Sequence, residues 1–155
     1  MNIINTGYET LVSGILATII AQIIKFFVFT IRTRKINFKI LTTTGGMPSS
    51  HSAGVIAMST TVGLIEGFDS IIFAVAIGFS LVVMYDATGI RRAAGKTAAC
   101  LNKIMEDFYK HNIQTLGGKL KELLGHTPLE VIIGAIFGAI FAYGFHLYLI
   151  GQTIA

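Results

Sequence analysis

The chain has 155 residues, which suits one domain, and it carries much less charge than a soluble protein does. Hydrophobic residues make up 53% of it and charged residues 13%, whereas soluble domains average about 25% charged residues. The net charge of +4 does not indicate nucleic-acid binding, because the basic residues flank long apolar stretches, where they set membrane topology. A single cysteine, Cys100, excludes an intrachain disulfide.

Four apolar stretches predict four membrane-embedded helices, the first at about 9–31. The second, at about 48–66, is the weakest, because its apolar part 53–65 is short and includes hydroxyl side chains. The alternative for this segment is a short helix buried among the others. The third is expected at about 69–88 and the fourth at about 128–150. The fourth contains 20 consecutive residues without Asp, Glu, Lys or Arg, the length that a helix needs to cross about 30 Å of hydrocarbon.

The stretch 89–127, between the third and fourth helices, is polar, yet apolar residues recur in it at helical spacing. This pattern is typical of an amphipathic helix on a membrane surface; a small soluble cap on the helix ends is the alternative. We therefore predict an all-α integral membrane bundle of about four transmembrane helices, forming a single domain over residues 1–155. An amphipathic or cytoplasmic helical insertion separates its third and fourth helices. The apolar residues of the insertion are Leu101, Ile104, Met105, Phe108 and Ile113.

Basic residues predict the orientation in the membrane. All 12 Lys and Arg residues fall in two segments, 25–39 and 91–121. With four spans, both segments lie on the same side of the membrane, and the positive-inside rule makes that side cytoplasmic. Both termini are then expected outside. The prediction fails if the second segment does not cross.

Three polar clusters lie at helix ends on the predicted cytoplasmic side, and the first covers residues 45–52. Pro48 suits the first turn of a helix, and Ser49 or Ser50 can cap it. A helix N-terminus attracts anions such as phosphate, so both serines are candidate phosphate-binding residues. His51 can give or take a proton near neutral pH. The alternative is a capped helix start with an incidental histidine.

The second cluster, residues 125–130, supports two interpretations. Thr127 and Glu130 form a capping box for the fourth helix. Glu130 can also orient His126, four residues earlier, so that the free ring nitrogen can act as a nucleophile. The two roles are compatible, because a carboxylate has two oxygens.

The remaining candidates supply charge. Arg91 and Arg92 follow the third span and suit phosphate, although topology or lipid headgroups also explain them. Asp86 lies at the end of an apolar span and most plausibly pairs with one of them. Lys25 lies inside the first span, two turns before Arg32; it either snorkels to the interface or faces inward to bind an anion.

The string at 48–51 (Pro-Ser-Ser-His), the Lys25–Arg32 pair and the His126–Glu130 pair together resemble the type 2 phosphatidic acid phosphatase superfamily. The vanadium-dependent haloperoxidases belong to this superfamily too. Its usual signature is Lys-x6-Arg-Pro, then Pro-Ser-Gly-His, then Ser-Arg-x5-His-x3-Asp. The chain looks like a divergent branch of that superfamily, and the resemblance covers most of its length.

The resemblance implies a mechanism that needs no metal and no cofactor. His126 would attack phosphorus and form a phosphohistidine, Glu130 would hold His126, and His51 would protonate the leaving oxygen. Cations would surround the phosphoryl oxygens, where charge spreads in the transition state. The cations implied are Lys25, Arg32, and Arg91 or Arg92.

The chain departs from the superfamily pattern in several places. Thr33 replaces the proline after the first arginine, and Arg34 competes with Arg32 for its role. Ser50 replaces a glycine, and Glu130 replaces an aspartate. The arginine expected just before the nucleophile is missing, and Arg91 and Arg92 lie some 35 residues upstream.

Two functions from different classes follow as hypotheses. The first is a phosphatase acting at the cytoplasmic face on a membrane lipid phosphate, with phosphatidylglycerophosphate as the favoured substrate. The second is a non-catalytic membrane protein that binds or transports anionic phospholipid or phosphorylated molecules. Anionic lipid headgroups are expected partners in both. Gly134 and Gly138 form a small-residue face, so close helix packing is expected there, within the chain or in a homo-oligomer.

Overall fold

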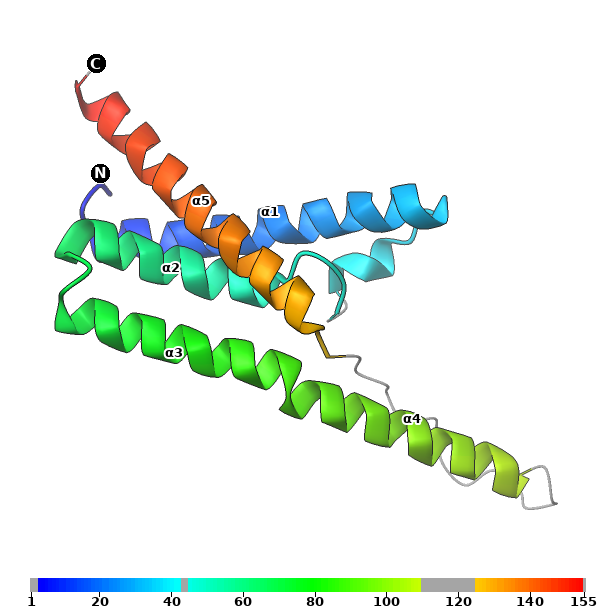
Figure 1. The fold of residues 1–155 in the computed structure, drawn as a ribbon. Helices are drawn as coiled ribbons and strands as arrows, with labels where there is room; N and C mark the ends of the chain where they lie inside the picture. The colour runs from blue at the N-terminus through cyan, green and yellow to red at the C-terminus, as the bar shows by residue number, and fades with distance from the viewer. Residues whose placement is uncertain (1–2, 43–44, 110–124, 155) are drawn as a thin grey trace.

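The computed structural model describes residues 3–42, 45–109 and 125–154, and every regular element in these ranges is helical. The side chains of 91, 92, 107–109 and 154 lie outside the described part. The prediction of an all-α membrane bundle is confirmed. Figure 1 shows the helices α1 (Gly7–Thr33), η1 (Phe38–Thr42), α2 (Ser50–Glu66), α3 (Ile71–Thr88), α4 (Ile90–Tyr109) and α5 (Pro128–Ile154), of which η1 is a short 3-10 helix.

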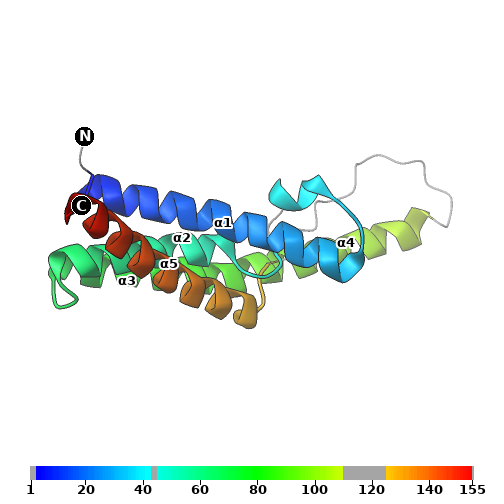
Figure 2. The same cartoon turned by 90° about the horizontal axis from the view of Figure 1, so that it is seen from above.

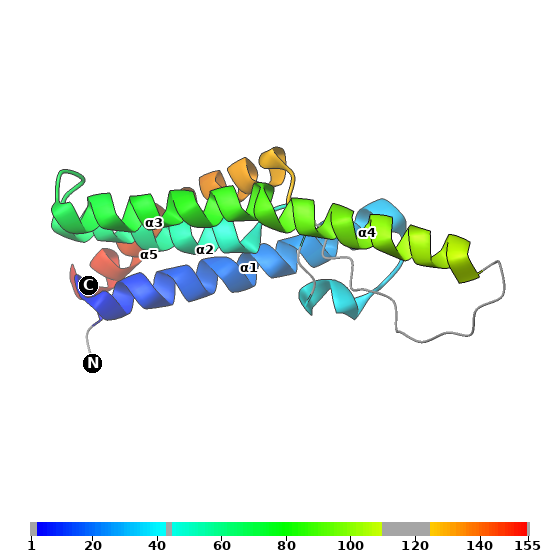
Figure 3. The ribbon, with the colours of Figure 1, turned by 90° about the horizontal axis from the view of Figure 1, so that it is seen from below.

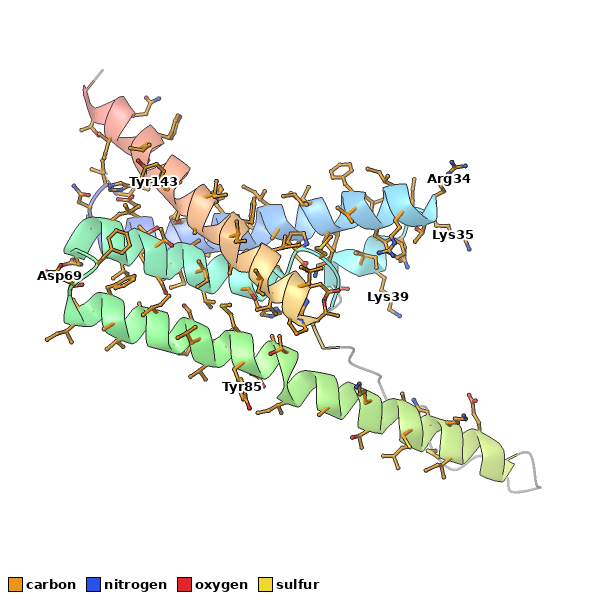
Figure 4. The ribbon with its side chains drawn as sticks, in the orientation of Figure 1. Arg34, Lys35, Lys39, Asp69, Tyr85 and Tyr143 are labelled. Carbon is orange, nitrogen blue, oxygen red and sulfur yellow. The ribbon has the colours of Figure 1, made fainter. Side chains whose placement is uncertain are left out.

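The bundle has two distinct ends. Helices α1, α2 and α3 run side by side, and α5 crosses them diagonally (Figures 1 and 2). Both chain termini and the turn between α2 and α3 lie at one end, which we call the terminal end. The first residues of α2, α4 and α5 lie at the other, which we call the basic end because Arg34, Lys35 and Lys39 gather there (Figure 4). Asp69 lies at the terminal end in the same view.

Three helical stretches of the described chain are long and apolar enough to span a membrane: Gly7–Thr33, Ile71–Glu106 and Pro128–Thr153. Helix α2 has 17 residues and is not among them. It contacts α1, α3 and α5, so it is the central helix of the bundle, as the alternative interpretation of this segment expected. At about 1.5 Å per residue it still measures roughly 25 Å, and it returns the chain from the basic end to the terminal end.

Small residues let α5 pack closely on α2. A Cβ atom added at Gly134 would collide with the carbonyl of Ser49, and one added at Gly138 would collide with the carbonyl of Ala53. Both glycines are buried, and such backbone approach is typical of helices packed inside membranes. The close contact expected at these glycines is therefore observed within the chain.

Hydroxyl side chains connect the central helix to its other neighbours. Ser59 of α2 shares a 2.8 Å hydrogen bond with Ser80 of α3. Thr61 of α2 donates a 3.0 Å hydrogen bond to Ser13 of α1. Because buried hydroxyl groups must be hydrogen-bonded, these pairs fix how α1 and α3 are rotated against α2. The large apolar side chains instead lie on the outside, where they suit lipid.

Candidate functional site

Lys25 faces the interior of the bundle at the basic end. Only 3% of its surface is exposed, so of the two alternatives for this residue the inward one is observed. The glycine loop before α2 lies against its aliphatic chain, because a Cβ atom added to Gly46 would be 3.3 Å from the lysine Cδ. Its Nζ atom has no hydrogen-bond partner among the described residues. A buried ammonium without a partner is costly, so this position favours an anion.

The segment between α1 and α2 folds back over the lysine. Phe38 of η1 stacks on Phe26 of α1 with ring centroids 5.4 Å apart. The side-chain amide of Gln22 donates a 2.9 Å hydrogen bond to the Leu41 carbonyl. Gly46 has a φ of +87°, a conformation that glycine adopts without strain. These contacts return the chain to α1 and place the start of α2 beside Lys25.

His126 and Glu130 form a pair at the start of α5. The His126 Nδ1 atom lies 3.1 Å from Glu130 Oε2. The same oxygen accepts a 3.1 Å hydrogen bond from the Thr127 N–H, and the Glu130 N–H bonds Thr127 Oγ1 at 3.3 Å. Glu130 thus both caps the helix and holds the histidine, and it does so through one oxygen where the sequence suggested two. A carboxylate only accepts, so Nδ1 is the donor and the neutral ring keeps its lone pair on Nε2.

The Nε2 atom of His126 is buried and has no hydrogen-bond partner among the described residues. Burial lowers the pKa of His126, the hydrogen bond to Glu130 opposes this, and the nearby charge of Lys25 lowers it further. The Gly46 backbone also raises the pKa, and its contribution is the smallest of these. The residue is 2% exposed, and its backbone N–H bonds the Ala87 carbonyl at 3.0 Å, which ties α5 to the end of α3. His126 therefore presents an unprotonated nitrogen beside a cation.

His51 lies in the first turn of α2, facing the same place from another element. Its ring centroid is 6.4 Å from that of His126, and the two planes meet at 68°. His51 is exposed where His126 is buried, so water or a substrate can reach it. Segments 75 residues apart in sequence thus bring two imidazoles to one point.

The two serines before His51 are buried, and Ser49 caps α2. Its Oγ accepts hydrogen bonds from the Ser52 N–H at 3.3 Å and the Ser52 hydroxyl at 3.0 Å. Its own N–H donates to the Glu130 carbonyl at 3.0 Å, which links the starts of α2 and α5. Ser49 therefore positions both histidine-bearing helices, and the first turn of α2 adds its positive dipole end to the site.

The arginines are less closely placed. Arg32 is exposed and lies about 10 Å further along α1 than Lys25. Arg91 and Arg92 start α4, but their side chains lie outside the described part. The predicted partner of Asp86 lies there too. Lys25 is thus the cation that the described structure places beside His126. No group of three or more His, Cys, Asp or Glu side chains suited to a metal ion occurs among the described residues.

The sequence analysis missed a second buried histidine–carboxylate pair. His146 Nδ1 lies 2.6 Å from Glu9 Oε1, and the Asn5 N–H donates a 2.7 Å hydrogen bond to Glu9 Oε2. Glu9 is fully buried and His146 is 8% exposed. The pair joins the first turns of α1 to the last turns of α5 at the terminal end. Ionisable residues inside two predicted apolar spans were the signal that could have revealed it.

Comparison with known proteins agrees with this architecture. The chain is 46% identical over 138 residues to the protein named "Uncharacterized membrane protein YuiD" of Bacillus subtilis (strain 168), an alignment that covers 83% of this chain and 87% of that protein. No solved structure gives a significant match. A family model described as "Divergent PAP2 family" matches residues 7–141, which include Lys25, His51, His126 and Glu130. The chain therefore belongs to the Divergent PAP2 family.

Proposed function

We propose that this protein is a metal-independent lipid phosphate phosphatase with a histidine nucleophile. The observation that carries the proposal is a pair of buried nitrogens at one place in the bundle, Lys25 Nζ and His126 Nε2, which no described residue hydrogen-bonds. A phosphoryl oxygen would satisfy the ammonium, and the phosphorus atom would then lie within reach of the imidazole lone pair. Glu130 already holds the imidazole of His126 in the orientation that a nucleophile needs.

The first chemical step forms an enzyme–phosphate bond. His126 Nε2 attacks phosphorus, the P–O ester bond breaks, and the leaving oxygen takes a proton from His51. Glu130 stabilises the positive charge that develops on His126 by accepting the Nδ1 hydrogen bond. Lys25 and the first turn of α2 stabilise the negative charge on the equatorial oxygens.

The second step releases phosphate. His51, now neutral, takes a proton from a water molecule, and the resulting hydroxide attacks phosphorus. The P–N bond breaks, and His126 regains its lone pair. The exposure of His51 favours this role, because the leaving group must depart and a water molecule must then enter next to this residue.

The substrate we propose is a phosphomonoester lipid presented at the cytoplasmic leaflet, with phosphatidylglycerophosphate tested first. The site lies at the basic end of the bundle, and the positive-inside rule assigns that end to the cytoplasm. A lipid substrate suits a site whose helices span the membrane, because its acyl chains can stay in the bilayer while the phosphate enters between α1, α2 and α5.

The test measures phosphate release by the purified protein in lipid nanodiscs, with a chelator present. Phosphatidylglycerophosphate, phosphatidic acid and an isoprenyl phosphate are compared. Turnover should disappear in His126→Asn, and rapid quenching of the native protein should yield an acid-labile, alkali-stable protein phosphate. Turnover that survives His126→Asn would remove the proposed nucleophile.

Vanadate distinguishes this function from the alternative, lipid binding without catalysis. The arginine missing before His126 is the observation that favours this alternative. A phosphatase of this kind should be inhibited by vanadate, which mimics the transferring phosphoryl group. Tight binding of lipid phosphate with no release of phosphate from any substrate would establish the non-catalytic function instead.

A further inference from the structure

Helix α4 presents an apolar face that no other described helix covers. Of the described elements only α3 contacts it, and Figure 3 shows it running on past the bundle. Ile90 is 66% exposed, Leu101 44% and Ile104 46%. The soluble-cap alternative expected the stretch 89–127 to pack on the helix ends; its residues 110–124 lie outside the described part, and of the described elements α4 contacts α3.

Covalent geometry places the start of α4 at a membrane surface. Helix α3 has 18 residues, so it covers about 27 Å, close to the thickness of the hydrocarbon. One residue, Gly89, separates it from α4, and its ψ of −86° departs from helical geometry, so the helix axis is interrupted there. An amphipathic helix thus begins where the hydrocarbon ends, beside a glycine about which it can reorient.

The width of the apolar face favours a lipid surface over a second copy of the chain. A two-stranded coiled coil needs a narrow apolar seam flanked by charged residues. In α4, most positions beside the seam are instead small or apolar, and with them the face is about 160° wide at 100° per residue. The seam consists of Ile90, Ala94, Thr97, Leu101 and Ile104. The small or apolar flanking positions are Ala93, Ala98, Cys100 and Met105, and the charged ones, Arg91 and Asp107, lie near the two ends of the helix.

The charge of α4 indicates which lipid it meets. The helix has four basic and two acidic residues in its sequence, and the exposed Lys96 and Lys103 lie outside the apolar face, next to its edge at Cys100. Amphipathic helices of this kind insert their apolar face about 5–10 Å into the headgroup boundary and gain from anionic lipids. We propose that α4 turns about Gly89 and lies on the bilayer surface at the basic end, bound to anionic phospholipid headgroups. This binding does not depend on the phosphatase function.

The single cysteine allows a direct test on the whole protein. Cys100→Ala removes the native thiol, and one cysteine is then placed on the apolar face (Leu101→Cys or Ile104→Cys) or on the polar face (Lys96→Cys or Lys103→Cys) as a matched control. Each variant carries a nitroxide label in nanodiscs of phosphatidylcholine with and without phosphatidylglycerol. The accessibility of the label to oxygen, which concentrates in lipid, is compared with its accessibility to a water-soluble nickel complex.

The proposal predicts that oxygen accessibility exceeds nickel accessibility at 101 and 104, that the reverse holds at 96 and 103, and that phosphatidylglycerol increases the contrast. Water accessibility at all four positions would overturn it, because the helix would then project into solution. Spin–spin broadening at 101 and 104 that disappears on dilution with unlabelled protein would show that a second copy covers the face instead. A contrast unchanged by phosphatidylglycerol would overturn the preference for anionic lipid.

Discussion

The bundle holds a buried histidine–carboxylate pair at each end, and the two pairs differ in what surrounds them. At the terminal end, Glu9 bonds His146 and the Asn5 N–H, and neither Glu9 nor His146 has a buried polar atom without a partner. At the basic end, His126 bonds Glu130, but its Nε2 atom is buried, and neither this atom nor the Lys25 ammonium has a hydrogen-bond partner within 3–42, 45–109 or 125–154.

On the proposed function, this difference separates a structural connection from a binding site. The closed pair, Glu9 and His146, satisfies its hydrogen bonds within the bundle and joins α1 to α5. The open pair, His126 and Glu130, leaves the desolvation of His126 Nε2 uncompensated by any described residue, so a ligand that bonds this atom would gain that free energy. Residue type alone, a histidine beside a carboxylate, does not distinguish the two.

Replacing each of the two histidines by asparagine, one at a time, should give the largest difference in turnover. His126→Asn should lower turnover by about 10³-fold or more, because the nucleophile is lost. His146→Asn should leave kcat nearly unchanged while it lowers the thermal midpoint. Phosphate release and thermal unfolding, measured on both variants at a temperature where both stay folded, check this. Equal losses of turnover would mean that both pairs serve catalysis.

Lys25→Met should separate function from stability. Turnover should fall about 10²-fold, the size expected when a preorganised stabiliser of transition-state charge is removed. The free energy of unfolding should rise by about 1 kcal/mol, because a thioether of similar length replaces a buried ammonium that no described residue hydrogen-bonds. Kinetics and detergent-denaturation curves on one preparation measure both. A less stable Lys25→Met protein would show that Lys25 has a structural partner.

A glycine substitution tests whether the open pair depends on helix packing. Gly134→Ala places a methyl group against the Ser49 carbonyl, whereas Gly144→Ala, on the same helix, meets nothing within 4 Å. Overpacking of this kind costs about 1–3 kcal/mol and should also move His51 relative to His126, so turnover should fall. Gly144→Ala should match the native protein in stability and turnover. Similar behaviour of the two variants would contradict the packing observed between α2 and α5.

The closed pair should contribute to stability and not to turnover. Glu9→Gln replaces the charged partner of His146 and should destabilise the protein by about 1–3 kcal/mol. The exposed Glu66→Gln, at the same end, is the matched control and should change the free energy of unfolding by less than about 0.5 kcal/mol. Denaturation curves of both variants decide the matter, and a stable Glu9→Gln protein would make the buried pair a candidate for another role.

The smallest expected effect is a change in the pH at which His126 titrates. The pKa of His126 is lowered by burial and by the charge of Lys25, so the residue stays neutral at pH values below its usual pKa of about 6.5. The nucleophilic form is therefore complete at neutral pH and is lost only as the pH falls through the lowered value. Imidazole NMR titration should show this, and Lys25→Met should shift the His126 titration to higher pH. An ordinary titration unaffected by Lys25→Met would show that the two groups do not interact.

The local features of the site were predictable because their partners are close in sequence. The capping box at Thr127 and Glu130, and the contact of Glu130 with His126, need only the spacing of a helical turn. The cap at Ser49 follows the same logic. The pair between Glu9 and His146 was not predictable from spacing, because 137 residues separate its members and their contact depends on how α5 crosses α1.

The sequence by itself determined that this protein is a helical membrane bundle and that its basic residues gather at one end, because hydrophobic length and charge distribution act without reference to tertiary contacts. It also predicted that His51, His126 and Lys25 belong to one site, which is the basis of the proposed function. Only the tertiary structure decided that α2 lies at the centre, that Lys25 turns inward, and that one pair is closed while the other is open. These properties depend on helix packing distances, which the close approach of small residues sets across segments far apart in the chain.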